Sequence, residues 1–126
     1  MTCLLAEQLH SQAQSLYAKF EQGGGTEYID EAVNLDRRAL TLCPPGHSKR
    51  PVSLVLLALH LGYRYNQLGE MKDLEEAIVL GRETVSLHPQ GHPNRSSSLN
   101  DLAIYLSSRY NQLGALWDLD EAIVLA

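Results

Sequence analysis

The sequence predicts an all-α fold, an α-solenoid of about three antiparallel helix pairs in which the last pair is truncated. The first observation is an internal repeat, because "RYNQLG" occurs at 64–69 and again at 109–114. The similarity extends further, since residues 64–81 and 109–126 are identical at 13 of 18 positions. The offset between the copies is 45 residues. A fixed period in this range is typical of solenoids, in which each unit buries its apolar face against its neighbours.

The second observation is that signals for helix ends recur with the same period. A more divergent copy lies upstream without a gap, and its Gly24 falls on Gly69 and Gly114. Glycine readily adopts the left-handed conformation that closes a helix, so "RYNQLG" is interpreted as the last turn and stop of a long helix. Pro44 and Pro89 then mark the stops of the second helices.

These signals place the elements along a single domain that covers residues 1–126. Three units are expected, at roughly 1–42, 46–88 and 91–126. Each unit pairs a longer first helix with a second helix, and the helices are predicted near 3–22, 28–42, 50–68, 73–88, 94–113 and 118–126.

The start of each second helix is predicted from its first residues. In "DLEEAIVL", Asp73 is a candidate N-cap and Glu76 follows three residues later, as in a capping box. Asp118 and Glu121 repeat this arrangement in the next copy. The upstream copy has Tyr28 where the capping aspartate would stand.

Composition and charge narrow the classes of partner. The 15 acidic residues outnumber the 10 basic ones, giving a net charge of −5. Binding to a nucleic-acid backbone requires clustered Lys and Arg, so a nucleic-acid partner is not expected. No apolar run is long enough to span a membrane and no signal peptide is apparent. With only Cys3 and Cys43, no disulfide framework is expected, and the predicted location is cytoplasmic.

Two kinds of motif resemble sites of chemistry. The glycine-rich stretch 22–26, "QGGGT", lacks the following Lys-Ser or Lys-Thr of a phosphate-binding loop and is predicted to be a turn between helices. The pairs Cys43/His47 and His88/His92 have metal-like spacing, but each straddles a proline break. We therefore expect no metal site, and we expect the histidines at 47 and 92 to order their turns.

A catalytic set cannot be assembled from the remaining polar residues. The acidic pairs at 75–76 and 120–121 recur with the repeat and suit the positive end of a helix dipole. The serines at 96–98 have no nucleophile-elbow context. Arg64 and Arg109 lie off the apolar stripe and are predicted to form salt bridges with neighbouring helices. The protein is therefore predicted not to be an enzyme and to need no cofactor.

The repeat resembles the tetratricopeptide motif, which has small residues where its two helices cross and a proline after the second helix. Ala58 and Ala77, or Ala103 and Ala122, match the crossing positions, and Pro89 follows Ala77 by 12 residues. The usual unit has about 34 residues, whereas this one has 45. The longer unit is similar to those of kinesin light chain, in particular "GHPNRSSSLNDLAIYL" at 91–106. It also resembles fungal tetratricopeptide arrays that precede a caspase-like CHAT protease or an NTPase domain.

The resemblance implies that the first helix of each unit lines a concave groove. We expect the groove to bind a peptide or a partner domain, so the protein would be an interaction module. It lacks the lysines of carboxylate-gripping tetratricopeptide domains, so an acidic C-terminus is not the expected ligand. Two alternatives remain: that these side chains only solvate a helix face, and that the chain is a sensor or scaffold part of a larger CHAT protease or NTPase. The predicted groove residues are His10, Gln14, Val52, Val55, Leu59, Tyr63, Asn66, Ser97, Asn100, Ile104, Ser108 and Asn111.

The end of the chain carries a further expectation. The last predicted helix stops after nine residues, at Ala126, whereas its counterparts run to Leu42 and Leu87. Such a short helix is marginal without packing support. We expect fraying from about residue 118, or self-association through the apolar C-terminal end.

Overall fold

Five α-helices lie within residues 2–113, which are the residues that the computed structural model describes. They are α1 (Thr2–Glu21), α2 (Thr26–Thr41), α3 (Arg50–Leu68), α4 (Met71–Leu87) and α5 (Arg95–Leu113). No strand occurs in this part of the chain, so the all-α prediction is confirmed. The predicted helix at 118–126 and the expectations for the C-terminal end lie outside the described residues.

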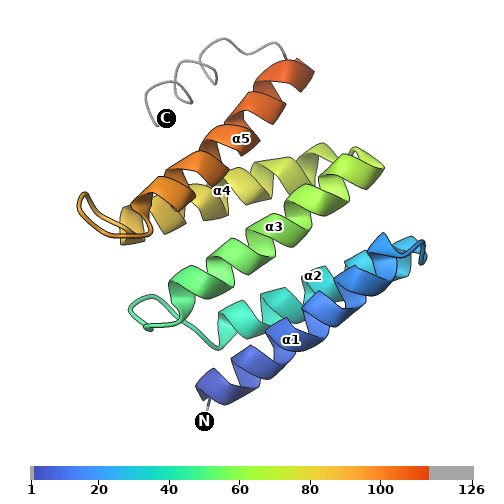
Figure 1. Ribbon diagram of the computed structural model, residues 1–126, viewed down its shortest axis with the longest axis horizontal. Helices are drawn as coiled ribbons and strands as arrows, with labels where there is room; N and C mark the ends of the chain where they lie inside the picture. The colour runs from blue at the N-terminus through green and yellow to red at the C-terminus, as the bar shows by residue number, and fades with distance from the viewer. Residues whose placement is uncertain (1, 114–126) are drawn as a thin grey trace.

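The helices pack in the order in which they follow one another in the sequence. α1 packs against α2, α2 against α3, α3 against α4, and α4 against α5. In Figure 1, α1, α3 and α5 run side by side on the near side, and α2 and α4 lie behind them. The alternation places the longer, first helix of each predicted unit on a common face. Side chains 45 residues apart on α3 and α5 therefore come close to one another.

The helices end where the sequence predicts, and the cause is visible at Gly69. This residue has a φ of 72° in the left-handed region, and its N–H donates to the Tyr65 carbonyl at 2.7 Å. Residues with a Cβ rarely adopt this conformation, so glycine closes α3 at low cost. α2 and α4 end shortly before Pro44 and Pro89, because proline cannot continue a helix.

The predicted capping role of Asp73 is wrong. α4 begins two residues earlier, and its N-cap position is Glu70, which makes no side-chain cap hydrogen bond. Asp73 is only 1% exposed, and its carboxylate accepts hydrogen bonds from Arg64 at 2.8 and 2.9 Å. Glu76 pairs with Arg37 on α2 instead of closing a capping box. Two ion pairs between helices therefore hold these carboxylates in place of a local cap.

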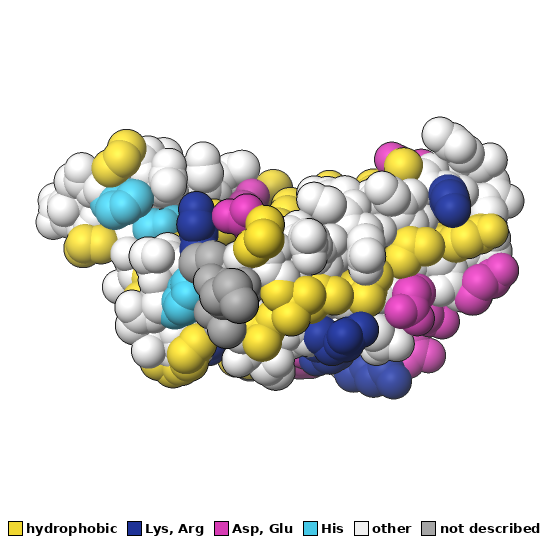
Figure 2. Space-filling view, turned by 90° about the horizontal axis from the view of Figure 1, so that it is seen from below, with side chains coloured by type: hydrophobic (Ala, Val, Ile, Leu, Met, Phe, Trp, Pro, Cys, Tyr) yellow, Lys and Arg dark blue, Asp and Glu magenta, His cyan; other side chains and the backbone are white. Residues whose placement is uncertain are grey.

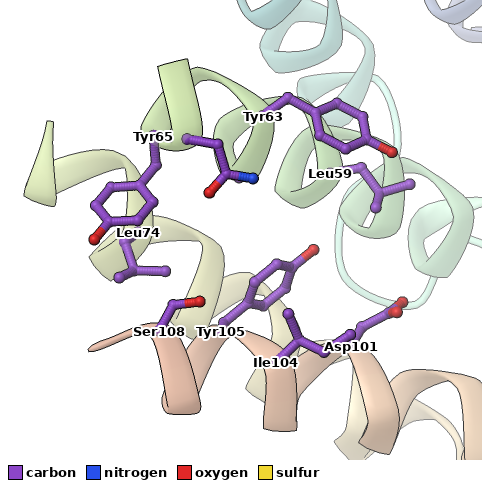
Figure 3. A pocket seen from close by; sticks show the side chains of 10 residues that line it. Leu59, Tyr63, Tyr65, Leu74, Asp101, Ile104, Tyr105 and Ser108 are labelled. Atoms are coloured by element: carbon purple, nitrogen blue, oxygen red, sulfur yellow. The ribbon is translucent and has the colours of Figure 1, made fainter. Parts of the chain in front are cut away.

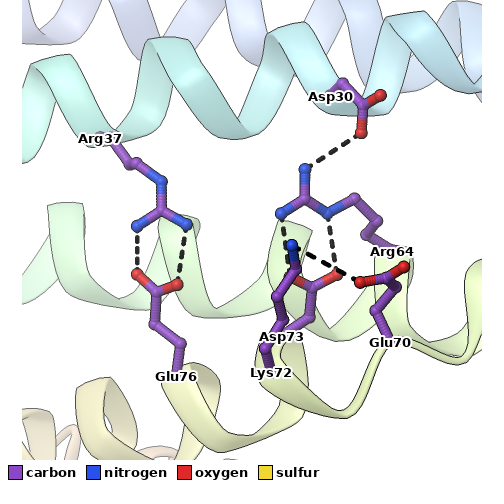
Figure 4. A network of polar contacts seen from close by, with 7 residues as sticks. All are labelled: Asp30, Arg37, Arg64, Glu70, Lys72, Asp73 and Glu76. Atoms are coloured by element: carbon purple, nitrogen blue, oxygen red, sulfur yellow. Dashed lines mark hydrogen bonds and ion pairs between the residues drawn. The ribbon is translucent and has the colours of Figure 1, made fainter.

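Arginine–carboxylate pairs connect helices across successive units, as predicted for Arg64 and Arg109. Figure 4 shows Arg64 of α3 between Asp73 of α4 and Asp30 of α2, whose carboxylate lies 3.0 Å away. Arg109 of α5 reaches Glu75 of α4 at 3.1 Å. The Arg64–Asp30 and Arg109–Glu75 pairs are related by the 45-residue period, so the same contact joins α2 to α3 and α4 to α5.

Buried side chains form two apolar clusters. The first, between α1 and α2, consists of Ala6, Leu9, Ala13, Ile29, Ala32, Leu35, Ala39 and Cys43. The second lies mainly among α3, α4 and α5. It contains Val33, Leu54, Leu57, Ala58, Leu61, Tyr65, Leu74, Ala77, Ile78, Leu80, Leu102, Tyr105 and Leu106. The predicted crossing residues Ala58 and Ala77 are both buried in the second cluster.

The surface at the α1–α2 end is mixed in character. Seen from below, this end shows a band of hydrophobic side chains with groups of basic and acidic side chains beside it (Figure 2). Leu4 and Leu5 of α1 are among the exposed large hydrophobic residues. Within residues 2–113, no helix has the length and apolar character needed to cross a membrane.

Candidate functional site

A hollow of about 250 Å³ opens between α3 and α5, and we call it the tyrosine hollow. In Figure 3, Tyr63 and Leu59 of α3 face Tyr105, Ile104 and Asp101 of α5 across it. The walls are mainly aliphatic and aromatic, which is typical of surfaces that bind ligands. Its lining residues are Leu59, Gly62, Tyr63, Tyr65, Asn66, Leu74, Asp101, Ile104, Tyr105 and Ser108.

A second hollow of about 380 Å³ lies next to it, towards the N-terminal ends of α3 and α5. We call it the histidine hollow, because His88 and His92 stack there with ring centroids 4.5 Å apart. Asp101 lines both hollows, so they adjoin each other, and we call the two together the α3–α5 groove. The lining of the histidine hollow is Ser48, Pro51, Val52, Val55, Leu56, Leu87, His88, His92, Asn94, Ser97, Ser98 and Asp101.

A third hollow, of about 540 Å³, extends the surface towards α1. Tyr63 and Asn66 line both it and the tyrosine hollow. Tyr17 of α1 stacks on Tyr63 with ring centroids 4.6 Å apart. Burial and the nearby Glu21 raise the pKa of Tyr17 to about 12, so its hydroxyl is neutral at neutral pH. The three hollows thus adjoin one another along α1, α3 and α5.

The structure brings most of the predicted groove residues of α3 and α5 together. The tyrosine hollow contains Leu59, Tyr63, Asn66, Ile104 and Ser108, and the histidine hollow contains Val52, Val55 and Ser97. Gln14, Asn100 and Asn111 are exposed, but they line none of the three hollows.

His10 lies elsewhere, and its predicted place on an open groove needs correction. It is only 8% exposed and binds Asp36 of α2 and Ser53 of α3. Its equivalents by the 45-residue period are Val55, which lines the histidine hollow, and the exposed Asn100. The hydrogen bonds to Asp36 and Ser53 hold His10 inside, between units.

Sequence reasoning missed two residues at the centre of the groove, Asp101 and Tyr105. Tyr105 is 8% exposed, and burial raises the pKa of its hydroxyl. Burial also raises the pKa of the Asp101 carboxyl. No hydrogen bond or ion pair to the Asp101 carboxylate occurs within residues 2–113. A carboxylate placed among apolar and aromatic groups is a signal for a site, but its position beside Tyr63 could not be seen from the sequence alone.

Positive charge is lacking from the surface formed by the three hollows. No lysine or arginine is among the described residues that line them. Burial, and secondly the charge of His92, lower the pKa of His88, so His88 is neutral at neutral pH. Apart from the histidines, the charged side chains among these lining residues are therefore the carboxylates of Asp101 and Glu21.

A separate buried network joins the first two units. The Asp36 carboxylate, 0% exposed, accepts hydrogen bonds from His10 Nδ1 at 2.8 Å and from His60 Nδ1. His10 Nε2 lies 2.9 Å from the Ser53 hydroxyl, and in the tautomer that carries its proton on Nδ1 it accepts a hydrogen bond from this hydroxyl. No buried side-chain nitrogen or oxygen in the described chain lacks a hydrogen-bond partner.

The network has the order of a serine–histidine–aspartate relay, but its surroundings do not suit catalysis. Ser53 is 1% exposed, so a substrate carbonyl cannot approach its hydroxyl. Its own N–H donates to the Lys49 carbonyl at 3.2 Å and cannot help to stabilise an oxyanion. The arrangement therefore fits a structural role between units.

The two histidine-containing turns are ordered as expected. His47 Nδ1 accepts the Lys49 N–H at 3.0 Å, and His92 Nδ1 accepts the Asn94 N–H at the same distance. Within the described residues, no group of three or more His, Cys, Asp or Glu side chains is placed to hold a metal ion.

Comparison with known proteins adds no relative. No protein-family model, no curated protein and no solved structure matches this chain. The side chains of the α3–α5 groove are therefore the basis on which its function is inferred.

Proposed function

We propose that this chain is an interaction module, a tetratricopeptide-like α-solenoid that binds an extended peptide segment of a partner protein in the α3–α5 groove, without catalytic activity of its own. The observation that supports it most is the convergence of repeat-equivalent positions on one groove. Leu59 and Ile104 are 45 residues apart and line the same hollow, as do Tyr63 and Ser108. Successive units thus contribute corresponding side chains to one surface.

The chemistry of the groove suits a peptide. Apolar walls such as Leu59 and Ile104 can hold side chains, whereas the amide of Asn66 and the hydroxyls of Ser97 and Ser108 can donate to and accept from a peptide backbone. The two hollows lie one after the other along α3 and α5, an arrangement that suits an extended segment. A catalytic reading has less support, because the relay-like Ser53 is buried.

The experiment selects phage-displayed 12-residue random peptides on the immobilised chain and measures the affinity of enriched peptides in solution. Ile104→Glu places a charge in the groove and should weaken these peptides by about tenfold or more. Val79→Glu is the matched control, because Val79 of α4 is 62% exposed and Ile104 is 53% exposed, yet Val79 lines none of the three hollows. Equal loss in both variants, or no enrichment over an empty surface, would contradict the proposal.

A further inference from the structure

We infer that the peptide recognised by the α3–α5 groove carries a basic side chain, lysine or arginine, whose charged group binds the Asp101 carboxylate while its aliphatic stem lies along the apolar walls. This inference rests on the proposed function and specifies the chemistry of the partner. It is carried by Asp101 together with the shape and composition of the groove around it.

The position of Asp101 is the first step. Asp101 is the residue that the tyrosine hollow and the histidine hollow share, so a ligand lying along the groove must pass it. The carboxylate is half-buried and has no hydrogen-bond or ion-pair partner within residues 2–113. A charge that has lost part of its water without gaining a partner is destabilised. A bound cation would restore the missing interaction.

The second step is charge complementarity. Arginine and lysine are lacking among the described residues that line the groove, and His88 is held neutral by burial and by His92. An acidic ligand would therefore meet the Asp101 carboxylate with no described cation to offset the repulsion. A basic ligand meets complementary charge, and the net charge of −5 favours its approach over longer distances.

The third step is the fit of a long basic side chain. Leu59, Ile104 and the rings of Tyr63 and Tyr105 surround the hollow beside Asp101 (Figure 3). Lysine and arginine bury their methylene stems along apolar walls and keep the charged end at a polar group. The face of an aromatic ring also attracts a cation. One side chain can thus use the apolar wall, the tyrosine rings and the carboxylate together.

The test uses three peptide libraries that differ in one fixed central residue, lysine, glutamine or glutamate, with the flanking positions random. The fixed-lysine library should enrich on the wild-type chain, and a peptide recovered from it should bind about tenfold more weakly to Asp101→Asn, measured by fluorescence anisotropy. Asp101→Lys should shift the enrichment to the fixed-glutamate library. Glu31→Gln removes an exposed acid of α2 that lies outside the three hollows, and it should leave the lysine preference unchanged.

The outcomes separate this inference from the proposed function. Equal enrichment of the three libraries, or unchanged affinity in Asp101→Asn, would overturn the inference and leave a peptide groove without charge preference. Enrichment of the fixed-glutamate library on the wild-type chain would overturn it as well. Failure of all three libraries would overturn both proposals. Circular dichroism of each variant confirms that it is folded, which is expected because Asp101 has no described partner to lose.

Discussion

Three residues that pack together in one part of the repeat differ in size from their equivalents in the next part, and the differences compensate for one another. Tyr105 of α5 packs between Gly62 of α3 and Gly81 of α4. A Cβ added at Gly62 would lie 3.3 Å from the Tyr105 ring, and a Cβ added at Gly81 would lie 3.6 Å from it. The residues 45 positions earlier, which correspond to Gly62, Gly81 and Tyr105 in that order, are Tyr17, Asp36 and His60. In the first set, the smaller imidazole of His60 is thus combined with the larger side chains of Tyr17 and Asp36. In the second set, the larger phenol of Tyr105 is combined with two glycines, which have no side chain. Close packing of interiors requires this compensation.

Removing the Asp36 carboxylate should be among the more destabilising single changes. Asp36→Ala leaves two buried imidazole N–H groups, of His10 and His60, without their acceptor. Buried donors left without partners cost their full desolvation, so we expect a loss of about 3 kcal/mol in the free energy of unfolding. Urea denaturation measures it. Glu31→Ala, at an exposed position of α2, should change stability by less than about 0.5 kcal/mol. A loss below about 1 kcal/mol for Asp36→Ala would show that the network contributes little.

Asp101 should behave in the opposite way. Because burial raises its pKa in the folded state, the protonated form is stabilised by folding. That contribution is complete below the unfolded pKa, about 4, and is lost as the pH rises through the raised folded pKa. At pH 7 the ionised Asp101 carboxylate therefore lowers the free energy of unfolding. Asp101→Asn should therefore keep or raise stability at pH 7, by less than about 1 kcal/mol, and this advantage should vanish on acidification. Urea denaturation at pH 7 and at a pH below the unfolded pKa tests this prediction. Clear destabilisation of Asp101→Asn at pH 7 would reveal a structural role.

At the level of helices, the sequence was most informative where the signal is local. The ends of α2, α3 and α4 follow from prolines and a glycine, because these residues restrict the backbone wherever they occur. Asp73 was misassigned because its preference for a cap competes with Arg64, which folding brings to the same place from an earlier helix. The His10–Asp36–His60 contacts were missed for the same reason, as they join residues 24 and 26 positions apart.

The groove was predictable only in part. Val52, Leu59 and Tyr63 could be placed because the repeat and the helical period together fix which face they share. Asp101 was not recognised, because an aspartate in a helix is ordinary until its neighbours are known. His10 was placed on the wrong surface, since the polar residues that bury it come from α2 and α3.

Two arginine–carboxylate pairs allow the effect of burial on helix–helix contacts to be measured. Arg64 and Asp73 are mostly buried, whereas the side chains of Arg37 and Glu76 are 44% and 31% exposed. Arg64→Ala leaves the buried Asp73 carboxylate without this partner and should cost about 3 kcal/mol. Arg37→Ala leaves an accessible carboxylate and should cost less than about 1 kcal/mol. Thermal or urea unfolding compares the two variants, and equal losses would mean that burial does not decide the contribution of these pairs.

Across the whole molecule, apolar burial is distributed unevenly. Half of the residues in the α1–α2 cluster are alanines, whereas the cluster around α3 and α4 is dominated by leucine, isoleucine and tyrosine. The outer positions of α1 are also more polar, since Gln12 and Ser15 stand where α5 has Leu102 and Tyr105. Between the clusters lies the polar network around Asp36. The first unit therefore has less apolar stabilisation of its own. It joins the second unit through the hydrogen-bonded network of His10, Asp36, Ser53 and His60, which we call the seam.

Units that contact only their neighbours can open one at a time. Hydrophobic stabilisation scales with the apolar area buried, so α1 and α2 should open with a free energy at least about 1 kcal/mol below that of α3 and α4. Native-state hydrogen exchange at low urea concentrations measures these values helix by helix. Asp36→Ala should lower protection in α1 and α2 more than in α4, because it breaks the seam and leaves the second cluster intact. All four helices could instead exchange through one global opening, with protection lowered equally by the substitution. That result would mean that the chain unfolds as a single unit and that the seam does not separate two units of different stability.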